Sequence, residues 1–141
     1  TGGAAGIYGG NGIDARFAGA GGGGGGAGLG GAIALVNGGS LAITDSQFLS
    51  TRAIGGEAGF NSYDNPRPAD AFGDARGASI FARGTVGVYT AMSDTGSPEG
   101  GLATTLGDLE GAGNTFTGNV VEDGTGNAVP DADVFMTIIL P

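Results

Sequence analysis

GLGGAIALVNGGSLAITDSQFLSTRAIGG, residues 28–56, holds two short apolar runs separated by a Gly-Gly pair. Within 33–35 and 40–44, large apolar residues alternate with small or polar ones. Such an alternation is typical of a half-buried β-strand. Neither run reaches the roughly ten residues of a helix, and Gly38-Gly39 would interrupt one. The stretch therefore predicts a strand, a tight turn and a second strand.

Parts of this pattern recur later in the chain. Segments 31–37 and 39–43 can be laid over 77–83 and 84–88, at offsets of 46 and 45 residues. A further match pairs Phe48 with Phe116 at a longer offset. These offsets lie near two and three multiples of about 23 residues, a plausible length for one coil of stacked short strands. We therefore expect an all-β fold, a short β-solenoid whose core includes Leu41, Ile43, Phe48, Val86, Val88 and Phe116.

Glycine dominates the composition, with 34 of 141 residues, but no strict Gly-X-Y period is present, which excludes collagen. By length the chain is one domain. We expect a glycine-rich segment at 1–28 and the solenoid at 29–141, with a turn-rich lateral loop inserted at 57–76. The run from Gly21 to Gly26 favours a flexible loop. Its alternative is a set of extended polyglycine strands that hydrogen-bond to one another.

The charge and the missing residue types exclude several functions. The chain has ten Asp and four Glu but only five Arg, which gives a net charge of −9. This charge argues against binding nucleic acid or an anionic membrane. No apolar run approaches the length of a membrane span, roughly 18 residues or more. Without cysteine, histidine or lysine, the chain has no disulfide, no familiar catalytic triad and no P-loop. We therefore expect no enzyme.

Carboxylates are the remaining candidates for chemistry. Asp14 lies in a lone match to a calcium-binding nonapeptide, and further acids follow near the C-terminus. Hard oxygen ligands of this kind suit calcium, although their spacing is not that of an EF-hand. The weak calcium candidates are Asp14, Asp123, Asp131 and Asp133, and a solvated acidic surface is the simpler interpretation. We expect no other cofactor or metal.

A second candidate lies in the inserted loop. Asp70 and Asp74, with Arg76, have the residue types of an acid, a base and an anion clamp acting on a polysaccharide. A solvated loop of ion pairs, which also includes Asp64 and Arg67, explains the same residues.

The C-terminal run, residues 134–140, would place apolar side chains on both faces of a strand, and Pro141 follows it. A strand of this kind is either covered on both sides or pairs with another chain. We expect it to pair with copies of this chain, or with flanking parts of a larger protein, and so to form a filament. The candidate assembly residues are Val134, Phe135, Met136, Ile138, Ile139 and Leu140.

The string GGGGGGAGLGGAI, followed by GGSLAITDSQF, resembles the glycine-rich coils of bacterial surface proteins with a right-handed parallel β-helix. These are of the autotransporter-passenger-like and cyanobacterial outer-surface type. The tail GNTFTGN, followed by DADVF, is similar to their last coil. The resemblance implies a right-handed parallel β-helix at the cell surface or outside the cell, with a structural or adhesive role. The alternative is a β-helix domain that binds or cleaves carbohydrate through the Asp/Arg loop.

Overall fold

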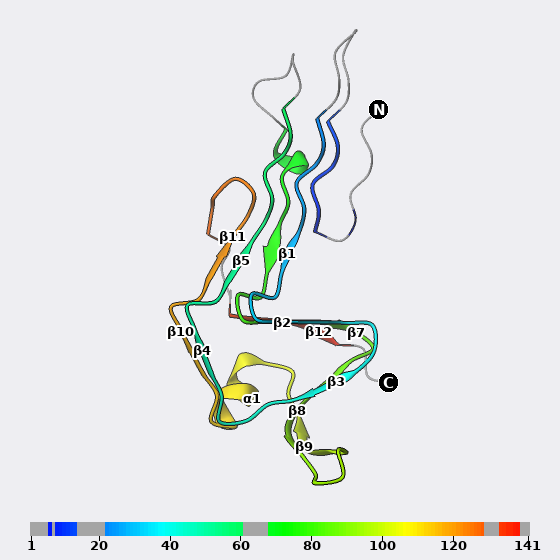
Figure 1. Cartoon of the computed structure of the whole chain (residues 1–141), viewed down its shortest axis with the longest axis vertical. Coiled ribbons are helices and arrows are strands. Elements are labelled where there is room, and N and C mark those ends of the chain that lie inside the picture. Colours follow the sequence, from blue (N-terminus) through cyan, green and yellow to red (C-terminus); the bar gives the residue numbers. More distant parts are fainter. Residues whose placement is uncertain (1–5, 7, 14–21, 61–67, 129–132, 139–141) are drawn as a thin grey trace. The chain divides into compact units, whose positions relative to one another are not determined.

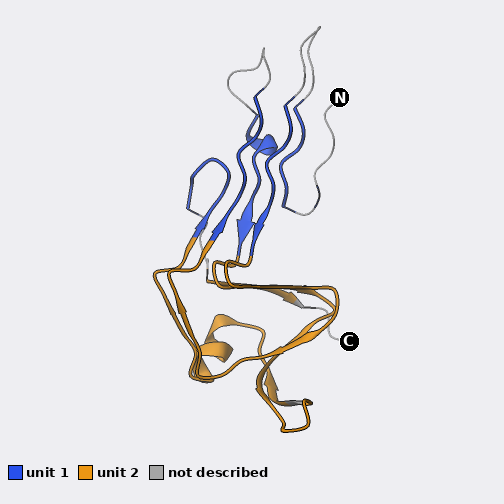
Figure 2. Ribbon diagram, in the orientation of Figure 1, with its two compact units in different colours: residues 1–29, 53–76, 121–130 blue, residues 30–52, 77–120, 131–141 orange. Residues whose placement is uncertain are grey.

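The computed structural model describes residues 6, 8–13, 22–60, 68–128 and 133–138 (Figure 1). The chain divides into two compact units (Figure 2). Unit 1 comprises 1–29, 53–76 and 121–130, and unit 2 comprises 30–52, 77–120 and 131–141. The predicted all-β class is confirmed, because the described elements are short strands with one α-helix and one 3-10 helix. In chain order they are β1 (Gly28–Leu29), β2 (Ile33–Val36), β3 (Ser40–Ala42), β4 (Gln47–Leu49), β5 (Arg52–Ile54), η1 (Ala69–Ala71), β6 (Ala75–Arg76), β7 (Ile80–Gly84), β8 (Gly87–Met92), β9 (Pro98–Leu102), α1 (Leu106–Gly111), β10 (Thr115–Thr117), β11 (Val120–Glu122) and β12 (Val134–Ile138).

Unit 2 is built mainly from parallel strand pairs. β7 is the middle strand of the sheet β12-β7-β2 and is parallel to both neighbours. β8 is the middle strand of β3-β8-β9, where β3 is parallel and β9 is antiparallel. β4 pairs in parallel with β10. The two strands predicted on either side of Gly38-Gly39 are thus present as β2 and β3, and they belong to different sheets.

The repeated segments lie side by side, but their register differs from the sequence match. The glycine match had placed Ile33 beside Ser79, whereas Ile33 faces Ile80 across the sheet, one position further along. It had placed Leu41 beside Val86, whereas Leu41 faces Val88, two positions further along. The observed register keeps the inward side chains of both strands on one face, as strand alternation requires.

The match between Phe48 and Phe116 has the predicted register. The two residues face each other in β4 and β10. Their rings stack with centroids 4.9 Å apart. The prediction of one shared core is confirmed as well, because Leu41 and Phe116 pack on a buried cluster that contains the other four predicted residues. The buried members of that cluster are Ile43, Phe48, Ile80, Ala82, Val86, Val88, Ala103 and Leu109.

The stretch 102–109, which fits a strand or a short helix by its sequence, contains the start of α1. Thr105 is the N-cap residue: its hydroxyl accepts the N–H of Asp108, and the Asp108 carboxylate accepts the N–H of Thr105. This capping box satisfies main-chain donors at the first turn. Leu109, on the inner face of α1, is fully buried in the core of unit 2.

Asn114 links α1 to the stretch between β3 and β4 in unit 2. Its side chain is 2% exposed, its Oδ1 accepts the N–H of Ser46 at 3.0 Å, and its Nδ2 donates to the carbonyls of Leu109 (2.8 Å) and Ile43 (3.3 Å). We expect Asn114→Ala to lower the free energy of unfolding by about 2–4 kcal/mol, because buried main-chain groups lose their partners. Urea denaturation measures this change. The exposed Asn127 provides the control, and an equal loss for Asn127→Ala would contradict the prediction.

Unit 1 is held together by main-chain hydrogen bonds that run in several directions. The segment 68–76 bonds to four other segments of the unit: through Asp70 to Asn11, through Ala71 to Gly25, and through Gly73 to both Gly56 and Gly124, at 2.7–2.9 Å. A strand in a sheet has at most two such neighbours. Extended chains with three residues per turn point their main-chain groups outward around the axis, which permits more neighbours. Phe72 has φ −81° and ψ 145°, the values of such a chain.

Glycine is required in this bundle because neighbouring backbones touch. A Cβ built on Gly25 would lie 1.9 Å from the carbonyl oxygen of Gly56. A Cβ on Gly73 would lie 1.9 Å from the carbonyl oxygen of Gly26. Of the two interpretations of the glycine run, packed extended strands therefore describe Gly22–Gly26, and the flexible loop does not. Gly21 lies outside the described residues.

The predicted short right-handed parallel β-helix, or β-solenoid, is wrong. The described strands form five separate sheets of only two or three strands, and these sheets close into no solenoid. Two physical features explain this outcome. The glycine-rich segments bond in more than two directions instead of extending a pleated ladder, and β9 joins its sheet antiparallel. The residues 68–76, predicted to be part of a lateral loop, include η1 and β6 and have hydrogen-bonded neighbours in unit 1.

Candidate functional site

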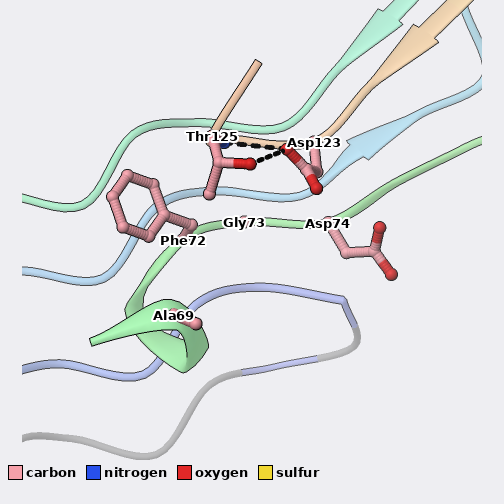
Figure 3. Close-up of a pocket in the computed structure, with 6 residues that line it drawn as sticks. All are labelled: Ala69, Phe72, Gly73, Asp74, Asp123 and Thr125. Atoms are coloured by element: carbon pink, nitrogen blue, oxygen red, sulfur yellow. Dashed lines mark hydrogen bonds between the residues drawn. The ribbon is translucent and has the colours of Figure 1, made fainter. Parts of the chain in front are cut away.

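A polar depression in unit 1 brings two predicted carboxylates together (Figure 3). Its volume is about 280 Å³. The N–H of Gly124 donates to the carbonyl of Gly73 at 2.7 Å, and this bond holds the preceding Asp123 close to Asp74. A close glycine–glycine contact thus positions two side chains that are far apart in the sequence. The depression is lined by Ala69, Phe72, Gly73, Asp74, Asp123 and Thr125.

Asp74 forms an ion pair with Arg76, with 2.7 Å between Oδ2 and a guanidinium nitrogen. Its Oδ1 also accepts the N–H of Ala75 at 2.8 Å. The Arg76 guanidinium lies over the ring of Tyr8, 5.2 Å from its centroid, a distance suited to a cation–π contact. Asp74 and Arg76 are therefore neighbours, as the sequence suggested. The contact of Arg76 with Tyr8 was not predicted, because the two residues are far apart in the sequence.

The carboxylate of Asp123 accepts hydrogen bonds from the turn that follows it. Its Oδ1 accepts the main-chain N–H groups of Thr125 (2.9 Å) and Asn127 (3.0 Å), and it also accepts the Thr125 hydroxyl. The Thr125 side-chain hydrogen bond is the main cause that lowers the pKa of Asp123, with the main-chain donors adding to it against the opposing effect of desolvation. A carboxylate with a lowered pKa is ionised at neutral pH, so Asp123 is a poor general acid.

We expect Asp123 to make the stability of unit 1 depend on pH. Its folded pKa lies below the 3.8 of an unperturbed aspartate. The ionised form therefore stabilises the fold fully above about pH 5, and this contribution is lost as the pH falls through the folded pKa. Melting temperatures from pH 7 to 2 should fall less steeply for Asp123→Asn than for the wild type. The pKa of Asp108 is also lowered, mainly by the main-chain N–H of Thr104, so some acid sensitivity remains in both proteins.

The control for this pH series is Asp94→Asn, which removes an exposed carboxylate from the hairpin between β8 and β9. This variant should keep the wild-type dependence on pH. If Asp123→Asn and Asp94→Asn gave the same curves, the proposed role of the Asp123 turn would be refuted.

The other predicted site residues are not gathered here. Asp70 accepts a hydrogen bond from the Asn11 side chain at 3.3 Å and does not line the depression. Asp133 belongs to unit 2, where its main-chain oxygen accepts the N–H groups of Ser79 and Ile80. Within the described ranges, no three acidic side chains form a group that could hold a metal ion. The predicted residues Asp14, Asp64, Arg67 and Asp131 lie outside the described residues, and calcium binding stays a prediction.

The predicted assembly residues lie in and after β12. Val134 and Met136 pack against the core of unit 2. Phe135 stacks on Phe81 with ring centroids 5.4 Å apart. Ile138 is the last residue of β12, and Ile139 and Leu140 lie outside the described residues. The side chains of Val134 and Met136 are thus packed within the same chain, while β12 remains an edge strand of its sheet.

The helices in the described part of the chain are all too short and too polar to cross a membrane. Comparison with known proteins found no matching family model, no matching curated protein and no matching solved structure. The resemblance to glycine-rich bacterial surface proteins therefore stays a prediction.

Proposed function

We propose that this chain is a non-enzymatic structural or adhesive module, located at a cell surface or outside the cell, which assembles by pairing of its strand edges. The observation that carries the proposal is a contiguous stretch of open edges in unit 2. β2, β3 and β4 follow one another between residues 33 and 49, and each is the edge strand of its sheet. Edge strands present main-chain donors and acceptors that another chain can pair with.

The side chains on this stretch favour contact with another surface. Leu49 is 59% exposed and Val36 is 46% exposed. Among the described residues of 33–49, Asp45 is the only charged one, so the edge lacks the charged side chains that usually block pairing. We define the open edge as residues 33–49. It differs in this respect from the chain as a whole, which carries a net charge of −9.

The other edge of the sheet that contains β2 suggests the partner. β12 and β2 are the two outer strands of β12-β7-β2, and both are parallel to β7. A β2 strand from a second copy could therefore pair in parallel with β12. This contact joins two different surfaces, and such contacts continue from copy to copy without closing. A second copy of this chain is the partner that we propose.

The test replaces Val36 and Leu49 by lysine in one variant. Two charges on the open edge should weaken the association at least about tenfold, since each desolvated charge costs on the order of 1 kcal/mol or more. Light scattering over a concentration series measures the association. The control is Met92→Lys, because Met92 is 44% exposed but lies outside the open edge, in the hairpin that β8 forms with β9. A wild type that remains monomeric at high concentration would refute the proposal.

Carbohydrate binding is the second candidate, and the depression in unit 1 favours it. The partly buried ring of Phe72 lines the same depression as Asp74, Asp123 and Thr125. Aromatic faces stack on sugar rings, while carboxylates and hydroxyls bond to sugar hydroxyl groups. A titration with neutral oligosaccharides, followed by NMR, tests this candidate. Shifts at Phe72 and Thr125 that vanish in Phe72→Ala would favour it, and unchanged spectra would exclude it.

A further inference from the structure

A second pocket lies in unit 2, where the sheet β12-β7-β2 ends. Arg83, in the middle strand, faces Val36 of β2 on one side and Thr137 of β12 on the other. Asn37, which follows the last residue of β2, lines the same pocket as Arg83 and Thr137. The pocket has a volume of about 270 Å³ and is lined by Asn37, Arg83, Gly84 and Thr137.

Arg83 is the distinctive residue of this pocket. Its side chain is half-buried, and among the described residues no carboxylate forms an ion pair with it. The chain has 14 acidic residues for five arginines, so partners are abundant. Arg76, by contrast, holds Asp74 at 2.7 Å. Because a half-buried charge without a counter-ion is unfavourable, a guanidinium left unpaired by these residues in so acidic a protein points to an anion from outside the chain.

The neighbours of Arg83 add hydrogen-bond donors. Asn37 has a positive φ of 48°, and its Oδ1 lies so close to Gly84 that a Cβ there would be 2.2 Å away. This contact points the amide oxygen at Gly84 and leaves the Nδ2 donor for a ligand. In the described part of the chain, neither Asn37 nor Thr137 uses its side chain in a hydrogen bond. The pocket thus offers a guanidinium, an amide and a hydroxyl, and its lining includes no carboxylate.

We propose that the Arg83 pocket binds the carboxylate group of a small organic acid, such as a sugar acid. The planar guanidinium fork matches the two oxygens of a carboxylate. A single positive charge balances a single negative one, whereas the net charge of −9 repels phosphate and other multivalent anions. The volume, just below the usual range of small-molecule sites, suits a ligand no larger than one sugar acid. This proposal does not rest on assembly through the open edge.

The test is an NMR titration of the full chain at constant ionic strength with sodium acetate, sodium glucuronate, inorganic phosphate and glucose. We expect both carboxylates to shift the resonances of Arg83 and Thr137 with a Kd on the order of 1 mM. Binding of acetate and glucuronate alike assigns recognition to the carboxylate, and binding of glucuronate alone assigns part of it to the sugar. Glucose should cause no shifts, and phosphate should bind more weakly than either acid.

Variants show whether the pocket is responsible. Arg83→Gln keeps the size and polarity but removes the charge, and should weaken carboxylate binding at least about tenfold. Thr137→Val is a nearly isosteric change at an exposed position, so it keeps the fold while removing one donor. The control, Arg52→Gln, removes an exposed arginine that lines neither of the two pockets, and should bind like the wild type. The proposal is overturned if the wild type responds to neither acetate nor glucuronate at 100 mM (about a hundred times the expected Kd), if both pocket variants bind normally, or if phosphate binds more tightly.

Discussion

Replacing Ile80 by aspartate is expected to unfold unit 2. Ile80 is fully buried in β7, the middle strand of its sheet, where it faces Ile33 and Val134 on the two neighbouring strands. The substitution removes apolar packing and places a carboxyl group where it has no partner. We expect a loss of at least about 5 kcal/mol, which is comparable with the whole stability of a typical domain of about 5–15 kcal/mol.

The measurement is the dispersion of amide NMR resonances from unit 2, which should collapse in Ile80→Asp. The control is Val36→Asp, because Val36 belongs to the same sheet but is 46% exposed. That variant should change the stability by no more than about 1 kcal/mol. A folded, well-dispersed Ile80→Asp protein would show that this core is not what holds unit 2 together.

Replacing Gly25 by alanine is expected to disrupt unit 1, while the same change at Gly26 is tolerated. A Cβ on Gly25 would lie 1.9 Å from the carbonyl oxygen of Gly56, whereas a Cβ on Gly26 meets no atom within 4 Å. To make room, Gly25 must move away from its hydrogen bonds with Gly10 and Ala71. Overpacking of this kind costs about 1–3 kcal/mol, and each lost hydrogen bond adds about 1 kcal/mol. Gly26→Ala should be neutral or stabilising by up to about 1 kcal/mol.

Thermal unfolding and amide hydrogen exchange measure this contrast between two adjacent glycines. In the wild type, the N–H groups of Gly25, Gly56 and Gly73 should be protected from exchange, because each donates to a neighbouring segment. Gly25→Ala should remove this protection, and Gly26→Ala should keep it. Equal behaviour of the two variants, with rapid exchange throughout, would mean that the run is a flexible loop after all.

The sequence alone was sufficient to predict the strands in which apolar and polar side chains alternate. The period of two predicted β2 and β3, and the matching phenylalanines predicted the register of β4 with β10. Both signals come from large side chains that must face one core, and that requirement can be read locally. The match based on glycines failed by one or two positions, since glycine has no side chain to fix a face.

The candidate sites were less accessible to sequence reasoning. The Asp74–Arg76 pair could be predicted because its members are neighbours along the chain, but Tyr8 could not. Arg83 left one signal that could have identified it: no acidic residue occurs from 75 to 93, in a chain that carries 14 of them. Of its flanking donors, Asn37 follows β2 and Thr137 lies in β12, and both strands are distant from β7 along the chain. Only the fold brings these donors to the arginine.

The amino-acid sequence by itself determined the all-β class, the inward faces of the strands and the acidic character of the chain. Only the tertiary structure decided how the short strands divide into separate sheets, and that the glycine run is packed instead of loose. The physical reason is that a glycine run has the same composition in both states. What distinguishes the two states is whether each main-chain N–H and C=O finds a partner on a distant segment, and such partners, from Gly10 to Gly124, become neighbours only when the chain has folded.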